Sequence, residues 1–275
     1  MMTTWYSDKI ATNGIQLHYT RTGGDKPAVV LAHGFSDDGL CWTPVAEKLA
    51  ADYDVIMVDA RGHGRSDAPE QGYSPIDMAT DLAGVITGLG LKKPAVLGHS
   101  MGGSATMALA GLFPELPGAI LIEDSGARNF MAGDNAEAQA RFKQWRERLV
   151  NLQSKSREAL IAQAHIDTPT WSAAELGPWA DAKLRFNLKA LNWQGADDID
   201  WNQILHDITC PALLLIADPE RGGGVTPERA AEMQALVPQL QVVHISGAGH
   251  NIRREQFAPY MAAISAFLAQ AMKGL

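Results

Sequence analysis

Short runs of apolar, β-favouring residues recur along the first half of the chain, and each run leads into a turn that contains Gly or Asp. Apolar runs of this length, without polar alternation, are typical of strands buried on both faces of a parallel sheet. The sequence therefore predicts parallel strands at residues 28–32, 54–59, 94–97 and 119–122.

Segments with helical spacing lie between these runs, at residues 42–51, 74–89 and 100–112. Ser74-Pro75 is a helix start signal, because proline fits the first helical position. Strands that alternate with helices need crossover connections, and these place helices on both faces of a parallel sheet. The pattern predicts an α/β fold.

The two ends of the chain complete this sheet. Asn13-Gly14 separates two strand-like stretches, residues 5–12 and 15–20, and this dipeptide between such stretches predicts a hairpin. The strand pattern returns at residues 212–217 and 241–245, each followed by a helical segment. We therefore expect a sheet that begins with an antiparallel hairpin and continues with parallel strands.

The region between these parts has a different character. Strand runs are missing, and residues 136–164 are rich in Gln, Arg and Glu with apolar residues at helical spacing. Five of the seven tryptophans lie here: Trp145, Trp171, Trp179, Trp193 and Trp201. The sequence predicts a helical cap over residues 127–206, inserted into a core formed by residues 1–126 and 207–275.

Composition narrows the classes of partner. The chain has 23 Lys and Arg against 31 Asp and Glu, a net charge of −8, which argues against nucleic-acid binding. Cys41 and Cys210 have no metal-like spacing and are expected to be free, buried thiols. No signal-peptide pattern or membrane-spanning apolar run is visible, so we expect a cytoplasmic protein without a membrane partner.

The most specific motif is G-H-S-M-G at residues 98–102, between a predicted strand and a predicted helix. In this context G-x-S-x-G forms a sharp turn that exposes the serine hydroxyl at the top of the sheet, and glycines flank it because side chains do not fit. The helix N-terminus behind the serine favours negative charge that forms there. Ser100 is the predicted nucleophile.

A general base is expected on a loop after the last strand. His250 meets this requirement, because it follows a predicted strand and a glycine-rich turn at residues 246–249. His244 lies inside the strand and is expected to pack. The remaining histidines belong to the hairpin, the cap or other motifs: His18, His33, His63, His99, His165 and His206.

Two backbone N–H groups are candidates for an oxyanion hole. His33-Gly34-Phe35 follows the strand at residues 28–32, and Met101 follows the predicted nucleophile. The N–H groups of Phe35 and Met101 could converge on the oxygen of a tetrahedral intermediate. The His33 side chain is expected to fix the loop rather than to act in catalysis.

Together these motifs resemble those of the α/β-hydrolase superfamily. They are H-G-F at 33–35, D-A-R-G-H-G-R-S-D at 59–67, G-H-S-M-G-G at 98–103 and G-A-G-H at 247–250, in the superfamily's order over nearly the whole chain. The resemblance implies an eight-stranded sheet, a lid after strand six and a Ser–acid–His triad. It also implies a structural role for residues 61–67, under the site.

The acid is where the sequence departs from this pattern. Relatives usually carry it after the seventh strand in a Gly-x-x-Asp turn, whereas residues 217–224 lack the glycine and are lengthened. Asp218 and Glu220 are both candidates. Asp124, after the sixth predicted strand, is a third, because a minority of relatives place the acid there. The sequence leaves the choice open.

The resemblance extends to small capped esterases and lactonases, including metal-independent acyl-homoserine lactonases. It implies a serine hydrolase that acts on a small-molecule ester or lactone, and the aromatic cap favours an apolar acyl group. No metal or nucleotide motif is present, so neither metal nor cofactor is expected. A cofactor-free haloperoxidase or perhydrolase, a C–C bond hydrolase and a small-molecule receptor with a vestigial triad stay open, because one fold supports several functions.

Overall fold

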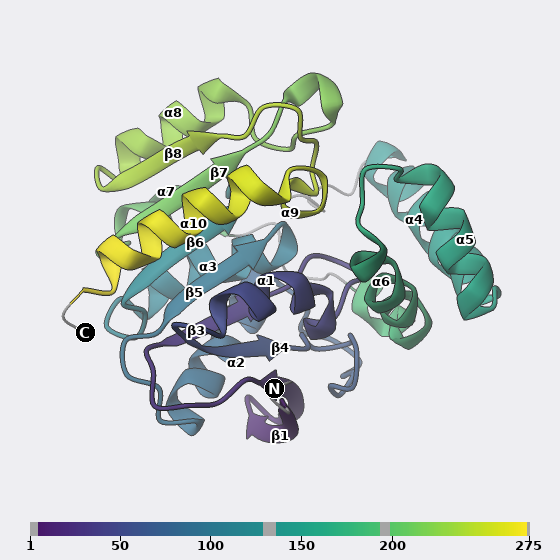
Figure 1. Cartoon of the computed structure of the whole chain (residues 1–275), viewed down its shortest axis with the longest axis horizontal. Helices are drawn as coiled ribbons and strands as arrows, with labels where there is room; N and C mark the ends of the chain where they lie inside the picture. The colour runs from purple at the N-terminus through teal and green to yellow at the C-terminus, as the bar shows by residue number, and fades with distance from the viewer. Residues whose placement is uncertain (1–4, 129–135, 193–198, 274–275) are drawn as a thin grey trace.

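A twisted eight-stranded sheet forms the centre of the molecule in the computed structural model, which describes residues 5–128, 136–192 and 199–273 (Figure 1). The strand order is β1-β2-β4-β3-β5-β6-β7-β8. The strands are β1 (Tyr6–Thr12), β2 (Ile15–Arg21), β3 (Ala28–Ala32), β4 (Asp54–Val58), β5 (Ala95–His99), β6 (Ala119–Glu123), β7 (Ala212–Ile216) and β8 (Leu240–His244). The predicted α/β-hydrolase fold is confirmed.

The strand pairing follows the sequence pattern. The β1–β2 hairpin turns at Asn13 and Gly14, both with positive φ, and β2 pairs antiparallel with β4. From β4 to β8 all pairs are parallel. Every residue of β3, β4, β5, β6 and β7 is buried, which is why these strands read as continuous apolar runs.

Helices cover both faces of the sheet. Alternate strand residues point to opposite faces: Val30 contributes to the core beneath α2 and α3, whereas Val29 and Leu31 contribute to the core beneath α1 and α10. A capping box between Ser74 and Asp77 starts α2, as the start signal predicted. The helices of this core are α1 (Thr43–Leu49), α2 (Pro75–Gly88), α3 (Met101–Leu112), α8 (Pro227–Leu236), α9 (Ile252–Glu255) and α10 (Phe257–Ala271), with 3-10 turns η1 (Gly39–Trp42) and η3 (Pro219–Arg221).

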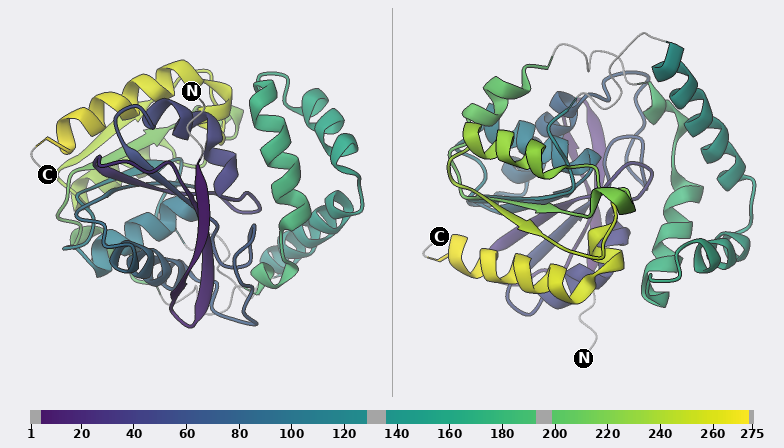
Figure 2. Two further views of the ribbon diagram at one scale, coloured as in Figure 1. Left: turned by 60° about the horizontal axis from the view of Figure 1, so that its bottom comes forward. Right: turned by 90° about the horizontal axis from the view of Figure 1, so that it is seen from above.

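Three helices inserted after β6 stand beyond one edge of the sheet (Figure 2), and we call them the cap helices: α4 (Ala136–Gln153), α5 (Arg157–Asp167) and α6 (Ala173–Arg185). The helical stretch expected at residues 136–164 is interrupted, because α4 ends and the Ser156 side chain caps α5. The turn η2 (Leu188–Leu191) follows.

The last helix of the predicted cap range, α7 (Trp201–His206), packs on the core. Trp201, Ile204 and Leu205 are buried, and the Ile204 carbonyl lies so close to α3 that a Cβ on Gly111 would be 2.3 Å from its oxygen. This close approach places α7 against α3. Of the cap tryptophans, Trp193 lies outside the described residues.

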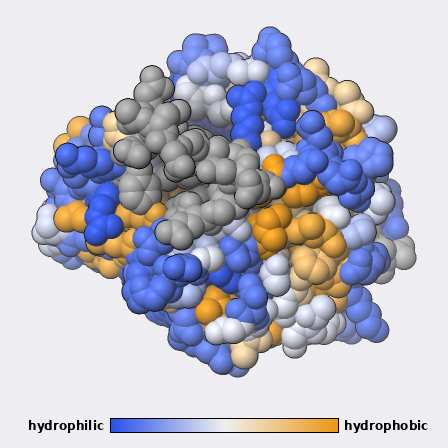
Figure 3. Space-filling view, turned by 180° about the vertical axis from the view of Figure 1, so that it is seen from behind, coloured by the Kyte–Doolittle hydropathy of each residue, from blue (hydrophilic) through white to orange (hydrophobic). Residues whose placement is uncertain are grey.

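The surface seen from behind carries apolar patches between hydrophilic ones (Figure 3). Within the described ranges, no helix combines the length and apolar character needed to cross a bilayer. Cys41 and Cys210 are free and buried, as predicted, and burial raises the pKa of the Cys210 thiol to about 11.

Candidate active site

The predicted site residues meet at the carboxyl edge of the sheet. Each of them follows one of five strands that are neighbours in the sheet: Phe35 follows β3, Ser100 follows β5, Asp124 follows β6, Asp218 follows β7 and His250 follows β8. Parallel strands bring these loops to one edge, which is where α/β sheets bind ligands.

Ser100 occupies a strained turn between β5 and α3. Its backbone has φ 51° and ψ −111°, a conformation that is uncommon for a residue with a side chain. A Cβ on Gly98 would lie 2.2 Å from the Gly102 carbonyl oxygen, and a Cβ on Gly102 would lie 2.2 Å from that of Ala32. Both flanking glycines are therefore required by close backbone approach, as the motif predicted.

His250 contacts Asp124. The distance between His250 Nδ1 and Asp124 Oδ2 is 2.6 Å, and the Asp124 side chain is completely buried. The same carboxylate accepts hydrogen bonds from the backbone N–H groups of Gly224 at 2.7 Å and Val225 at 3.1 Å. With Nδ1–H donated to Asp124, the Nε2 atom of a neutral His250 ring is a proton acceptor.

Asp218, the second candidate acid, contacts a different histidine. Its Oδ1 lies 2.6 Å from His244 Nε2, and its Oδ2 accepts a 2.7 Å bond from the Gly247 N–H. These two interactions, the Gly247 bond first, lower the pKa of Asp218. Glu220, the third candidate, is exposed on η3.

The expectation that His244 packs inside the strand is wrong. Its side chain is 50% exposed, and its ring is held by Asp218 instead of by apolar neighbours. The reason is that β8 is the last strand of the sheet. It has a neighbouring strand on one side only, so its side chains are less covered than those of the central strands.

Backbone strain gathers at this edge. Six non-glycine residues in the described part of the chain have a positive φ, and four of them lie around the site: Ser36, Ser100, Asp124 and Ala127. Such conformations cost about 1–3 kcal/mol each and persist where the surroundings over-determine them, often at functional sites. Apart from the elbow motif, no sequence signal marked these positions.

The loop after β3 is held by both ring nitrogens of His33. Its Nδ1 donates to the Gly34 carbonyl at 2.8 Å, and its Nε2 accepts a 3.0 Å bond from the Ala60 N–H. Met101, the other predicted oxyanion residue, is the first residue of α3. His33 therefore has the loop-fixing contacts that the sequence suggested.

Aromatic side chains from core and cap surround Phe35. Its ring stacks on Trp145 of α4 with centroids 5.1 Å apart and meets Phe186, just after α6, edge-on at 5.1 Å. His63 packs against both Phe35 and Phe186. Burial lowers the pKa of His63 to about 3, so this ring is a neutral part of an apolar wall.

The loop at residues 59–67 is tied to the core beneath the site. Asp59 accepts hydrogen bonds from the Gly39 N–H at 2.7 Å and the Arg65 N–H at 2.8 Å, and it pairs with His18. Arg61 forms a two-pronged ion pair with buried Asp81, both bonds at 2.6 Å. These contacts fit the structural role that the resemblance implied.

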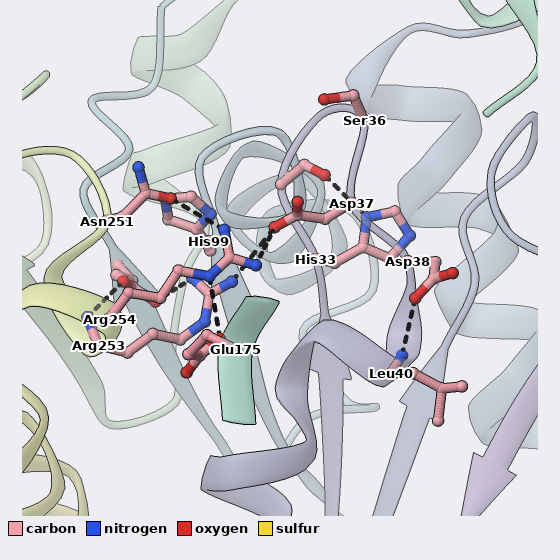
Figure 4. Close-up of polar contacts among 12 residues, drawn as sticks. His33, Ser36, Asp37, Asp38, Leu40, His99, Glu175, Asn251, Arg253 and Arg254 are labelled. Atoms are coloured by element: carbon pink, nitrogen blue, oxygen red, sulfur yellow. Dashed lines mark hydrogen bonds and ion pairs between the residues drawn. The ribbon is translucent and has the colours of Figure 1, made fainter. Parts of the chain in front are cut away.

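A buried ionic network, which sequence reasoning missed, joins the loop after β3 to α6 and α9. We call its six members the edge network: Asp37, Glu123, Glu175, Lys183, Arg253 and Arg254. Figure 4 shows Arg253 and Arg254 converging on Asp37, with Glu175 on the other side of Arg254. The only sequence signal was Arg253-Arg254, three and four residues beyond His250.

The edge network is balanced, with three carboxylates and three cations. Burial opposes ionisation of Asp37, but Arg254, Lys183 and Arg253 outweigh it, and the pKa of this carboxyl lies well below its usual range. No cluster of His, Cys, Asp or Glu among the described residues could hold a metal ion.

Comparison with known proteins identifies the family. Residues 29–263 match the model of the Alpha/beta hydrolase family. The chain belongs to this family. This alpha/beta hydrolase is therefore a hydrolase by family, built on the fold described above.

Two relatives match nine-tenths or more of this alpha/beta hydrolase. It is 29% identical over 271 residues to the N-formylmaleamate deformylase of Pseudomonas putida, covering 94% of this chain and 95% of the relative. It is 27% identical over 256 residues to the 2-(acetamidomethylene)succinate hydrolase of Mesorhizobium japonicum, covering 90% of each. Among solved structures, the enol-lactonase of Burkholderia xenovorans is similar, with a TM-score of 0.74, 25% identity and coverage of 95% of this chain and 100% of that one.

Proposed function

We propose that this alpha/beta hydrolase is a serine hydrolase that cleaves a carboxylic ester or lactone, with Ser100 as nucleophile, His250 as general base and Asp124 as the triad acid. The observation that carries the proposal is the 2.6 Å contact between His250 and buried Asp124, on loops beside the strained Ser100 turn. Nucleophile, base and orienting acid are the parts that acyl transfer requires.

The mechanism follows from these groups. His250 Nε2 takes the Ser100 proton as Oγ attacks the carbonyl carbon, and the Phe35 and Met101 N–H groups stabilise the oxyanion. When the intermediate collapses, the leaving alcohol receives the proton from His250. Water then gives a proton to His250 and attacks the acyl-enzyme carbonyl. When this second intermediate collapses, the acid is released and His250 returns the proton to Ser100 Oγ.

The surroundings of the site favour an uncharged, apolar acyl group. Phe35, Trp145 and Phe186 form an aromatic wall that suits apolar substrate atoms. The cations of the edge network are each paired with a buried carboxylate, so their charges are neutralised within the protein. A similar enol-lactonase structure supports this choice of bond.

Cleavage of an N-acyl bond is a second candidate. It is favoured by the two relatives that match over nine-tenths of the chain, a deformylase and an acetamidomethylene succinate hydrolase by name. The same triad would serve, but His250 would have to protonate a nitrogen leaving group before it departs, since an amide anion is a poor leaving group.

A labelling experiment and a substrate screen test the proposal. A fluorophosphonate probe should label the native protein but not the Ser100→Ala variant, and Ser104→Ala, one turn along α3, should still be labelled. The screen compares short and long p-nitrophenyl esters, lactones, N-formyl and N-acetyl compounds and a vinylogous diketone. Hydrolysis that is unchanged in Ser100→Ala would refute the proposal, and turnover of the N-acyl compounds alone would select the second candidate.

A further inference from the structure

Lys183 is a buried cation on the cap that contacts the loop after β3. It lies on α6, and its side chain is only 7% exposed. Its ammonium donates to the Ser36 carbonyl oxygen at 2.8 Å, to Ser36 Oγ at 2.9 Å and to Asp37 Oδ1 at 3.0 Å. A charged donor makes a stronger hydrogen bond to a carbonyl oxygen than a neutral one does, and burial of the Lys183 side chain limits competition from water.

The residue that Lys183 holds is strained. Ser36 has φ 63°, in the left-handed region that favours glycine, and directly follows Phe35. Its N–H donates to His63 Nε2 at 3.2 Å, while its carbonyl is bound by Lys183. Hydrogen bonds therefore hold the backbone on both sides of the strained Ser36 Cα, and they fix the orientation of the Phe35–Ser36 segment.

This contact can be separated from the rest of the edge network. Asp37 also accepts from Arg254 Nη2 at 3.0 Å and Arg253 Nη2 at 3.3 Å, so it keeps two cationic partners without Lys183 (Figure 4). Without the Lys183 charge each carboxylate of the edge network keeps an arginine partner, although three carboxylates then share two cations and the melting temperature should fall. The distinctive contribution of Lys183 is its hydrogen bonding to Ser36.

We propose that Lys183 is a positioning residue for the oxyanion hole: from the cap, it holds Ser36 in its left-handed conformation and so aims the Phe35 N–H at the developing oxyanion. The inference rests on the proposed serine-hydrolase function. An oxyanion donor is effective only when its geometry is set before the reaction. Under this proposal α6 helps to set that geometry, in addition to covering the substrate.

The test compares Lys183→Met and Lys183→Gln with a matched control, Arg185→Met. Arg185 lies two residues further along α6 and also joins the cap to the loop after β3. Its Nη2 and Nε atoms donate to Asp38 Oδ2 at 2.6 Å and 2.9 Å, so its contact is with a side chain and not with the backbone. For each variant kcat, KM, the inhibition constant of phenylboronic acid and the melting temperature are measured. The boronate forms a tetrahedral adduct on the serine and thereby reports on the oxyanion hole.

Loss of one oxyanion donor costs about 100- to 1,000-fold in kcat, and we expect about 10- to 100-fold for a misaligned one in Lys183→Met. Boronate affinity should fall by a similar factor, with KM changed less than about threefold. Lys183→Gln, whose amide can still donate to Ser36, should recover part of both losses. Arg185→Met should lower the melting temperature and keep its boronate affinity.

Two results would overturn the inference: a folded Lys183→Met protein with unchanged kcat and boronate affinity, or an equal loss of boronate affinity in Arg185→Met. If Lys183→Met does not fold, Lys183→Ala, which also lacks a donor, decides by the same measures. Failure of the proposed function is recognised separately, because wild-type protein would then show no Ser100-dependent turnover and no boronate inhibition at all.

Discussion

Two histidine–aspartate pairs lie at the same edge of the sheet, and single residues distinguish them. Both distances are 2.6 Å, between His250 and Asp124 and between His244 and Asp218. The two histidines are similarly exposed, but the Asp124 side chain is completely buried and accepts two backbone N–H bonds, whereas that of Asp218 is 12% exposed and accepts one. A catalytic acid orients its histidine from a buried, fixed position, so the proposed triad uses the first pair.

Replacing each aspartate separates the two pairs. We expect Asp124→Asn to lower kcat by about 1,000-fold or more, because an amide in place of the carboxylate neither holds the required tautomer nor stabilises the imidazolium. Asp218→Asn should change kcat less than about tenfold. Steady-state kinetics with one ester measure both, and a larger loss in Asp218→Asn would reassign the acid.

The sequence predicted the nucleophile and base positions but left the acid among three residues. Ser100 and His250 carry local signals, a glycine-framed turn and a glycine-rich loop after a strand. The acid has none, because a carboxylate after β6 and one after β7 both reach the same edge, and the choice depends on loop geometry. Gly224 and Val225, which bind Asp124, lie 100 and 101 residues away in sequence.

At the scale of elements, the buried strands were predicted closely and the packing of helices was not. Continuous apolar runs identify strands such as β3, which matches residues 28–32. Helical spacing, by contrast, shows that a helix has an apolar face but not which partner covers it. For that reason α7 was assigned to the cap although it packs on α3, and the break before Ser156 was missed.

A glycine within a helix tests the α3–α7 packing. Gly111→Ala should destabilise the protein by about 1–3 kcal/mol, because the new Cβ would lie 2.3 Å from the Ile204 carbonyl oxygen, which is backbone and cannot move alone. Urea unfolding measures the change, and a Gly111→Ala protein as stable as the wild type would contradict this packing argument.

For the molecule as a whole, two buried histidines contribute to the loss of stability in mild acid. Burial is the main reason that the pKa of His63 is lowered to about 3 and that of His99 lies well below its usual value. Each is neutral in the folded protein, whereas an unfolded histidine takes up a proton near pH 6.5. The stability that each contributes is thus complete above pH 6.5 and is lost as the pH falls from 6.5 toward the folded pKa.

We predict that the free energy of unfolding falls below pH 6.5 by about 1.4 kcal/mol per pH unit for each such histidine. His63→Gln should flatten this slope by about that amount, since one proton fewer is taken up on unfolding. The measurement is urea unfolding at several values between pH 7.5 and pH 4.5. His165→Gln, at an exposed position on α5, is the control and should keep the wild-type slope.

The buried charges of the edge network were beyond reach from the sequence. Its six residues come from distant parts of the chain. Charged residues are usually exposed, so a sequence gives no reason to expect these to be buried. Only the fold brings them together, and each pairs with a residue on another element.

The placement of His250 against a carboxylate just after β6 has a consequence for the segment between β7 and α8. That segment holds Asp124 through the backbone N–H groups of Gly224 and Val225, and a Cβ on Gly224 would lie 3.3 Å from Asp124 Oδ2 and 3.6 Å from His250 Nδ1. Gly224 and buried Val225 are therefore fixed by the site, whereas the residues of η3, just before them, are exposed. New side chains that bind a ligand are best introduced on η3, because substitutions there leave the two amides in place.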